Sequence, residues 1–168
     1  MKITVKNVKV AQFASEETLC FEATVYIDGK RGFTAHNQGH GGSNMYYPIK
    51  KGDDFDRSLL DAAEEWVKKQ PEIVCDDMND PNDPEKPFSY QPCLDHFVDK
   101  AVNEFQNEKE LKKVLKKALI FDGSKIFSYN CKIDHPKIRE QIKKNNPDAV
   151  IMNDLPLDEA LEIFMKYG

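Results

Sequence analysis

Residues 19–27 alternate strictly between apolar and polar side chains, and no other feature of the sequence constrains the fold as strongly. The apolar positions are Leu19, Phe21, Ala23, Val25 and Ile27. Because successive side chains of a β-strand point to opposite faces, the pattern predicts a strand with one buried face. Asp28-Gly29 follows directly and is typical of a tight turn. The alternation therefore predicts the first strand of an antiparallel hairpin.

The return strand carries its apolar side chains at Phe33 and Ala35. The loop length determines whether these side chains face the same side of the hairpin as the apolar side chains of the first strand. A two-residue loop would pair Phe33 with Thr24 and place the phenyl ring on the polar face. A three-residue loop over 27–29 pairs Phe33 with Ala23 instead, and it puts Gly29 where a positive φ is required. We therefore expect the three-residue loop.

A polar segment with three glycines in four positions follows the hairpin at 37–44 and must be a loop. Together with the preceding histidine it supplies the candidate binding residues His36, Asn37, Gln38, Gly39, His40, Gly41, Gly42, Ser43 and Asn44. Its backbone N–H groups could form a nest for an anion, but the P-loop pattern and its lysine are missing. The alternatives are a recognition loop, with His40 and Asn44 as polar contacts, and a mobile connection.

Apolar stripes at helical spacing predict a helix over 54–70 and two consecutive helices over 92–106 and 108–118. Asn107 and Glu110 resemble a capping box that separates the latter two. The stretch 75–92 holds four prolines and many acidic residues, which indicates a long irregular connection. The strand expected over 2–12 changes phase, and a bulge or turn at Lys6-Asn7 would reconcile its halves.

The last third of the chain is expected to run strand, turn, strand, helix, strand, helix, with Asp134 and Asp154 as helix caps. Strand–helix–strand order predicts a right-handed parallel crossover. The predicted class is α+β: an N-terminal antiparallel hairpin or meander packed on a helix, then helices and a C-terminal ββαβα unit. The expected division is a first lobe over 1–74, an acidic connection over 75–91 and a second lobe over 92–168.

Charge and hydropathy argue against two classes of function. The 168 residues carry a formal charge of −5, so general binding to nucleic acid is disfavoured. The apolar runs are too short to span a membrane, and the N-terminus lacks a signal-peptide core. Four widely spaced cysteines without a zinc-ligand spacing are typical of free thiols in a reducing cytoplasm, although a disulfide between two of them stays open.

No complete catalytic or metal signature is present. In the expected register His36 lies beside Cys20, with Glu22 nearby, but no oxyanion hole can be identified, so we assign no catalytic residue. Whether the chain is an enzyme stays open, with a non-enzymatic protein favoured. The spacing of His36, His40, Asp53 and Asp54 is no evidence for a metal site. The acidic run that starts at Asp76 does not fit an EF-hand, because its sixth and twelfth positions hold Pro81 and Pro87 where the motif needs glycine and glutamate. We expect no cofactor and no metal.

The stretch from Phe13 to Gly29, followed by Gly39-His40-Gly41-Gly42, resembles an uncharacterised family of small proteins encoded by phages and prophages. The later Asn153-Asp-Leu-Pro156 is similar to that family as well. The family has no known activity, so the resemblance implies no site residue. It implies a protein of the host cytoplasm that binds or inhibits a host protein, including defence proteins, through the glycine-rich loop. The alternatives are a binding protein for a small anionic ligand, phosphate or nucleotide, and a hydrolase that uses Cys20 or His36.

Overall fold

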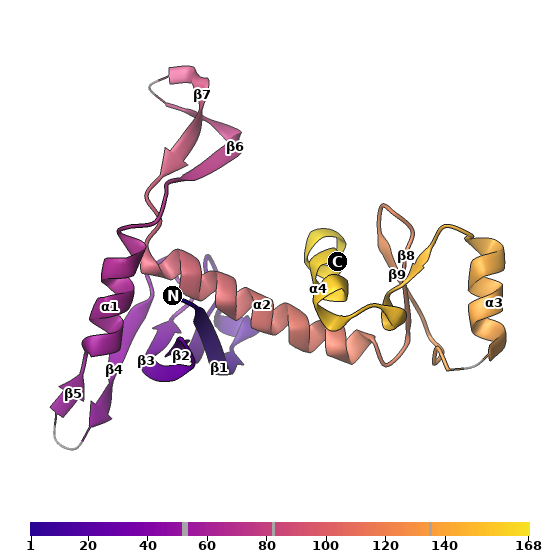
Figure 1. Ribbon diagram of the computed structural model, residues 1–168, viewed down its shortest axis with the longest axis horizontal. Helices are drawn as coiled ribbons and strands as arrows, with labels where there is room; N and C mark the ends of the chain where they lie inside the picture. The colour runs from indigo at the N-terminus through magenta and orange to yellow at the C-terminus, as the bar shows by residue number, and fades with distance from the viewer. Residues whose placement is uncertain (52–53, 82, 135) are drawn as a thin grey trace. The chain divides into compact units, whose positions relative to one another are not determined.

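The computed structural model describes residues 1–51, 54–81, 83–134 and 136–168 (Figure 1). The chain forms two compact units, Met1–Val102 and Asn103–Gly168. Both combine strands with helices, so the predicted α+β class is confirmed. Within the described residues, no helix is long and apolar enough to cross a membrane.

The first unit contains a five-stranded antiparallel meander in which each strand pairs with the next one along the chain. Its strands are β1 (Ile3–Val10), β2 (Phe21–Ile27), β3 (Lys30–Asn37), β4 (Met45–Lys51) and β5 (Asp54–Asp56). The irregularity expected at Lys6-Asn7 is present, because the pairing register shifts between Lys6 and Lys9 and Asn7 has a φ of 54°.

The turn between β2 and β3 corrects the expected register. Ile27 pairs with Lys30, so the loop has two residues and not three. Asp28 and Gly29 have φ values of 48° and 79°, which a two-residue turn of this kind requires. The register then shifts by one residue, because Tyr26 pairs with Arg31 and Val25 with Phe33. Gly32 is the extra residue, and this bulge turns Phe33 back toward the core.

The predicted orientation of the hairpin is nevertheless confirmed, since Val25, Phe33 and Ala35 are fully buried. The corrected register places His36 opposite Glu22, whereas Cys20 precedes β2 and does not pair with His36. The expectation that Cys20 lies beside His36 across the ladder was therefore wrong.

Helix α1 (Ser58–Val67) buries Leu60, Ala63 and Val67. It is shorter than the helix predicted over 54–70, because residues 54–56 pair with the end of β4 as strand β5. The carboxylate of Asp56 explains where the helix begins: its Oδ1 accepts hydrogen bonds from the backbone N–H and the hydroxyl of Ser58, over 3.0 and 2.6 Å. Aspartate favours such local bonds to the backbone over a place in a helix interior.

The stretch expected to be an irregular connection is a hairpin. Strands β6 (Ile73–Asp80) and β7 (Asp83–Tyr90) pair antiparallel as a two-stranded sheet. The prolines misled the prediction. In a two-stranded sheet every strand is an edge strand, where a residue without an N–H is tolerated, and Pro87 lies opposite Asn79 at a register shift.

Helix α2 (Leu94–Val114) is one continuous helix where two were predicted. The predicted capping box at Asn107 therefore lies inside the helix. The buried residues Val98 and Val102 belong to the first unit, whereas Leu111 packs in a core cluster of the second. The apolar stripe changes face because the helix contributes to two cores, and the break in phase does not mark a helix end.

The second unit has a three-stranded sheet of β8 (Ala118–Phe121), β9 (Ile126–Tyr129) and β10 (Val150–Ile151), in the order β10–β8–β9. Strand β8 is antiparallel to both neighbours, so β9 and β10 run parallel. The expected parallel crossover through α3 (Pro136–Asn145) is thus present, with β8 lying between its two strands.

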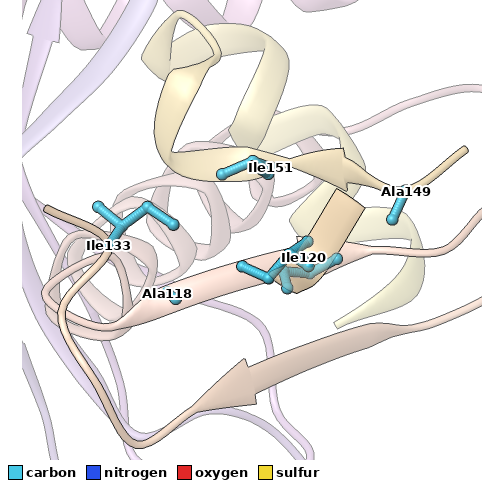
Figure 2. Packing of buried hydrophobic residues seen from close by; sticks show 6 residues of the cluster. Ala118, Ile120, Ile133, Ala149 and Ile151 are labelled. Carbon is cyan, nitrogen blue, oxygen red and sulfur yellow. The ribbon is translucent and has the colours of Figure 1, made fainter. Parts of the chain in front are cut away.

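Both faces of β8 are buried. Ala118 and Ile120 pack in one cluster with Ile133, Ile142, Ala149 and Ile151. Figure 2 labels five of these six residues. Leu119 packs on the other face with Leu111, Met152 and Ala160, the last from helix α4 (Leu157–Tyr167).

Asp154 does not cap α4, contrary to the prediction. The helix begins at Leu157 after Pro156, without a side-chain cap. The Asp154 carboxylate instead forms an ion pair with Arg139. The neighbouring Asn153 has the larger structural role: its Oδ1 accepts the Leu119 N–H over 2.8 Å, and its Nδ2 donates to the carbonyls of Leu115 and Lys117.

Candidate functional site

The base of the glycine-rich loop is organised by Asn37, the last residue of β3, which is only 6% exposed. Its Oδ1 accepts hydrogen bonds from the Thr18 hydroxyl and from the Gly39 N–H, both over 2.8 Å. Its Nδ2 donates to the Gly42 carbonyl over 2.8 Å and to Asn44 Oδ1 over 3.0 Å. Because both ends of the amide are used, the side chain determines the path of the loop.

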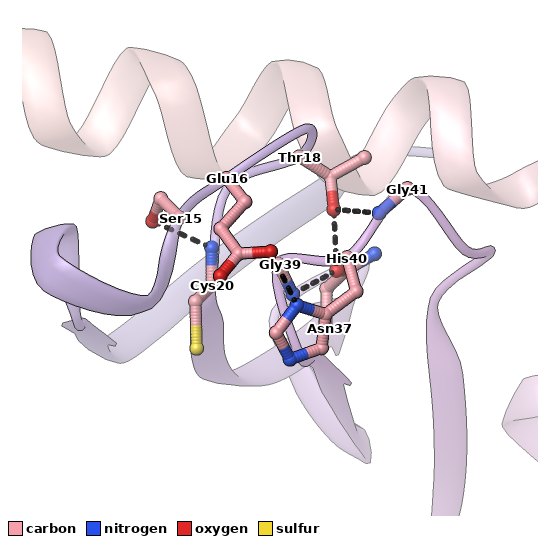
Figure 3. A network of polar contacts seen from close by, with 8 residues as sticks. All are labelled: Ser15, Glu16, Thr18, Cys20, Asn37, Gly39, His40 and Gly41. Atoms are coloured by element: carbon pink, nitrogen blue, oxygen red, sulfur yellow. Dashed lines mark hydrogen bonds and ion pairs between the residues drawn. The ribbon is translucent and has the colours of Figure 1, made fainter.

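The connection between β1 and β2 forms one wall of the loop (Figure 3). The Gly39 carbonyl accepts hydrogen bonds from the N–H groups of Glu16, Glu17 and Thr18, over 3.0 to 3.3 Å. Gly39 has a φ of 88°, and a Cβ at this position would lie 2.0 Å from the Ala14 carbonyl oxygen. Both the backbone conformation and the close approach therefore require glycine at this position.

The far end of the loop is held by two carboxylates one turn apart on α2. The backbone N–H of Asn44 donates to Asp95 Oδ2 over 3.0 Å, and its Nδ2 donates to Asp99 Oδ1 over 2.7 Å. The Tyr46 hydroxyl donates to the other oxygen of Asp95 over 2.6 Å. The Asn44 side chain is 8% exposed, so the strand that follows the loop starts from a buried polar contact.

Burial raises the pKa values of two groups in this contact, Asp99 and Tyr46. Partial burial raises the pKa of the Asp99 carboxyl above its ordinary value, and the negative charge of Asp95 adds to the rise, whereas the hydrogen bond from Asn44 opposes it. Burial also raises the pKa of Tyr46, and so does the hydrogen bond to Asp95. The tyrosine therefore remains a protonated donor to Asp95 at all ordinary pH values.

The hydrogen-bond network divides eight of the nine predicted site residues, all but His36, into two groups. Asn37, Gly39 and Asn44 are buried and hold the loop in shape, whereas the tip residues Gln38, His40, Gly41, Gly42 and Ser43 are exposed. Among the described residues, no buried side-chain nitrogen or oxygen lacks a hydrogen-bond partner. The loop thus combines a satisfied polar base with an exposed tip.

The two histidines have different surroundings. The His36 ring stacks on Tyr47 of β4, with centroids 5.5 Å apart and planes 7° apart. On the loop tip, His40 Nδ1 lies 3.1 Å from Glu16 Oε2, and both side chains are exposed. The structure therefore places His36 on the sheet and only His40 on the tip.

A surface pocket of about 530 Å³ lies between the loop and the adjoining strands. Its lining residues are Lys9, Val10, Ala11, Cys20, Phe21, Glu22, His36, Asn37, Gln38 and His40. Cys20, Glu22 and His36 thus share one pocket although the predicted register between them was wrong. Lys9 Nζ lies 3.3 Å from Glu22 Oε1, so an ion pair borders the pocket.

The glycine content of the loop suggested an anion nest, but the hydrogen bonds of its backbone do not support one. The Gly39 N–H donates to Asn37 Oδ1, and the Gly41 N–H donates to the Thr18 hydroxyl over 3.3 Å. Both N–H groups are therefore already used in hydrogen bonds within the chain and are not available to an anion.

Four residues of the site were missed from the sequence. Thr18, Asp95 and Asp99 anchor the loop from distant parts of the chain, and no local pattern signals such contacts. Phe13 lies in a 3₁₀ turn (Gln12–Ala14) beside the loop and is 95% exposed. Little in the sequence singles out Phe13, because it is a lone aromatic residue outside any apolar periodicity.

No group of three or more histidine, cysteine, aspartate or glutamate side chains in the described part of the chain could hold a metal ion. Of the four residues weighed earlier for such a site, Asp53 lies outside the described residues. The four cysteines are free thiols.

No family model, no curated protein and no solved structure matches this chain.

Proposed function

We propose that the chain is a non-enzymatic binding protein, encoded by a phage, which inhibits a defence-related protein of the host by engaging it through the glycine-rich loop. The observation that carries the proposal is the contrast between the buried base of the loop and its exposed tip. Asn37 and Asn44 hold the base, and Gln38, His40 and Ser43 face solvent.

A loop of this kind suits recognition for a thermodynamic reason. Ordering a mobile loop upon binding costs conformational entropy, and a loop already held by its own hydrogen bonds avoids most of that cost. The tip offers amide, imidazole and hydroxyl groups, which can pair with polar groups of a partner. The resemblance to phage proteins suggests the class of partner, and the ordered loop with its exposed tip supports the choice of surface.

The proposal is tested by capture from a bacterial host lysate with the immobilised full chain. The matched pair of variants is Gln38→Ala/His40→Ala/Ser43→Ala on the tip and Asp61→Ala/Glu65→Ala/Lys68→Ala on the exposed face of α1 and its C-cap. We expect a partner that the wild type and the α1 variant retain and the tip variant loses. Failure to recover any partner, or equal recovery by the tip variant, would reject the proposal.

A second candidate function rests on the pocket, because Cys20, Glu22 and His36 all line it. It would hold a small anionic ligand such as phosphate or a nucleotide, or support hydrolysis by Cys20. A ligand that binds only the folded state raises the free energy of unfolding in proportion to ln(1 + [L]/Kd) and thereby raises the melting temperature, so thermal-shift measurements with nucleotides test binding. A flat response at saturating ligand rejects it, and full hydrolytic activity in a Cys20→Ala variant rejects the cysteine mechanism.

A further inference from the structure

The charge of the chain is distributed unevenly along the sequence. Residues 109–144 contain eleven lysine and arginine side chains but only four aspartates and glutamates, so this stretch carries +7 in a chain whose total is −5. The whole stretch belongs to the second unit. The negative total charge, which argues against general binding to nucleic acid, therefore does not describe the surface of this part of the chain.

Strand β9 carries two exposed aromatic side chains. Phe127 is 40% exposed and Tyr129 is 42% exposed. They are two residues apart in the strand, so both rings lie on the same face of the sheet. Because the strand order is β10–β8–β9, β9 is an edge strand. The two rings therefore form an aromatic row along an open edge of the sheet.

The neighbouring strand holds the aromatic row in place. Phe127 pairs with Ile120 and Tyr129 pairs with Ala118, and both partners on β8 are buried. Opposite residues of an antiparallel pair share a face, so the rings lie beside the cluster that Ala118 and Ile120 form with Ile142 of α3. A strand with this backing presents its rings at little cost in conformational entropy.

Positive charge lies at the start of the aromatic row. Lys125 precedes β9, and its Nζ lies 5.0 Å from the centroid of the Phe127 ring. The acidic residue of the same turn is Asp122, whose Oδ1 accepts the N–H groups of Ser124 and Lys125, both over 2.9 Å. That carboxylate is used within the turn, and the Lys125 ammonium group lies over the ring instead of forming an ion pair with it.

Positive charge also lies at the end of the aromatic row. The Ala118 N–H donates to the Cys131 carbonyl over 2.9 Å, which joins the turn at 116–117 to the residues that follow β9. This turn contains two exposed lysines, and the exposed Lys132 comes next after Cys131. Within the described part of the chain, none of these three lysines takes part in an ion pair. Their charges are therefore available to an anionic partner.

Helix α3 adds two more lysines. Arg139 and Lys143 contact the residues that flank β10, which are Asp154 and Ala149. These contacts define the flank of the helix that lies toward β10. Helical periodicity places Lys137 and Lys144 on the other flank, and both are exposed. Because β8 separates β10 from β9, that other flank is the one nearer the aromatic row.

We propose that the second unit binds single-stranded nucleic acid, with Phe127 and Tyr129 stacking on bases and the surrounding lysines pairing with phosphates. Sheets that recognise unpaired bases use exposed aromatic side chains in this way, beside basic residues that follow the backbone. The inference is independent of the proposed function, which rests on the loop of the first unit.

The aromatic row selects this partner among anionic ones. Lysines alone suit an acidic peptide or a duplex as well as a single strand. The two rings favour a single strand, because each unpaired base offers a flat face for stacking. The bases of a duplex are already stacked on one another and offer no such face.

The test is fluorescence anisotropy of the purified full chain with labelled oligothymidylate and oligouridylate of about 15 nucleotides. The two oligonucleotides distinguish DNA from RNA, and binding of either one supports the inference. We expect the affinity to fall as the salt concentration rises from about 50 to 200 mM, because lysines displace counterions from the phosphates. A duplex of the same length and polyglutamate serve as competitors, and both should compete less well than the unlabelled single strand.

Leucine substitutions test the stacking. Phe127→Leu and Tyr129→Leu keep an apolar side chain on the sheet but remove the ring, so each should weaken binding by about five- to hundredfold. Tyr129→Phe keeps the ring and should bind as the wild type does. Tyr47→Leu is the matched control, since Tyr47 is also exposed, at 50%, but lies on β4. Circular dichroism of each variant checks the fold.

Glutamine substitutions test the phosphate contacts. For a single strand each contact contributes roughly 0.7 to the slope of log affinity against log salt, so Lys116→Gln/Lys117→Gln should reduce that slope by about 1.4. Lys68→Gln/Lys69→Gln removes the same charge at the end of α1, in the first unit, and should leave the slope unchanged.

An oligonucleotide of abasic sites separates stacking from charge without any substitution, because it keeps the phosphates and lacks the bases. The wild type should bind it at least about fivefold more weakly than oligothymidylate. The inference is overturned by any of three results: neither single strand binds, the abasic strand or the leucine variants bind as tightly as the reference, or duplex or polyglutamate competes as well as the single strand. Capture of a host protein depends on the loop of the first unit, so the two proposals fail separately.

Discussion

Asn37 Nδ2 donates a hydrogen bond to Asn44 Oδ1 over 3.0 Å, which joins the last residue of β3 to the residue before β4 across the neck of the glycine-rich loop. Both side chains are buried. Their remaining donors and acceptors bind Thr18 and backbone groups of the loop on one side and Asp99 on the other. The exposed tip therefore depends on a polar contact that is itself part of the protein interior.

Asn37→Ala tests this contact. The substitution leaves the Gly39 N–H, the Gly42 carbonyl and two side chains without their partner, so we expect the free energy of unfolding to fall by about 2–4 kcal/mol. Urea unfolding followed by the fluorescence of Trp66, in the same unit, measures it. Gln38→Ala, one residue further along and exposed, should change stability by less than about 0.5 kcal/mol. Equal effects of the two substitutions would contradict the role given to Asn37.

Gly39→Ala tests the close approach of the loop to the β1–β2 connection. The left-handed backbone and the contact with the Ala14 carbonyl should together cost about 2–4 kcal/mol of stability. Gly42→Ala is the control from the same loop, because nothing lies within 4 Å of a Cβ there. That variant should be neutral or more stable by about 0.4–1 kcal/mol, through a less flexible unfolded chain. A Gly39→Ala protein as stable as the wild type would show that the two segments are not in contact.

Asp99→Asn tests the pH dependence. The pKa of Asp99 is raised in the folded protein above its ordinary value of 3.8, so the folded state binds this proton more readily than the unfolded state. The contribution of Asp99 to stability therefore increases as the pH falls through the raised pKa toward 3.8, and it is least favourable at neutral pH. Asparagine keeps the oxygen that accepts from Asn44 and carries no charge.

We therefore expect Asp99→Asn to be at least as stable as the wild type at neutral pH, with an advantage that shrinks as the pH approaches 3.8. Urea unfolding at a series of pH values measures the difference. The exposed Asp61→Asn substitution provides the comparison. A difference between Asp99→Asn and the wild type that does not change with pH would refute the assignment.

Asn153→Ala tests the second unit by itself. The Asn153 side chain holds the Leu119 N–H and the carbonyls of Leu115 and Lys117. Its removal should destabilise this unit by about 2–3 kcal/mol, since Leu119 is buried and its N–H would lose its partner. Hydrogen–deuterium exchange of the β8 amides should accelerate, with little change in β2 and β3. Asn130→Ala, on an exposed turn, should leave exchange in β8 unchanged.

The sequence by itself determined the features that depend on local periodicity. Alternation identified β2 and its buried face, and helical stripes identified α1 and α4. Three glycines marked the loop, and its base and tip fall within the predicted residues. These predictions succeeded because side-chain direction repeats every two residues in a strand and every 3.6 residues in a helix, whatever the partner.

Only the tertiary structure decided the rest. The bulge at Gly32, the continuity of α2 through two cores and the pairing of β6 with β7 each depend on a partner that the local pattern does not contain. The same holds for the loop, where Asn44 binds Asp95 and Asp99 across 51 and 55 residues. A hydrogen bond between such distant residues forms because the fold brings them together, so it leaves no periodic signal in the chain.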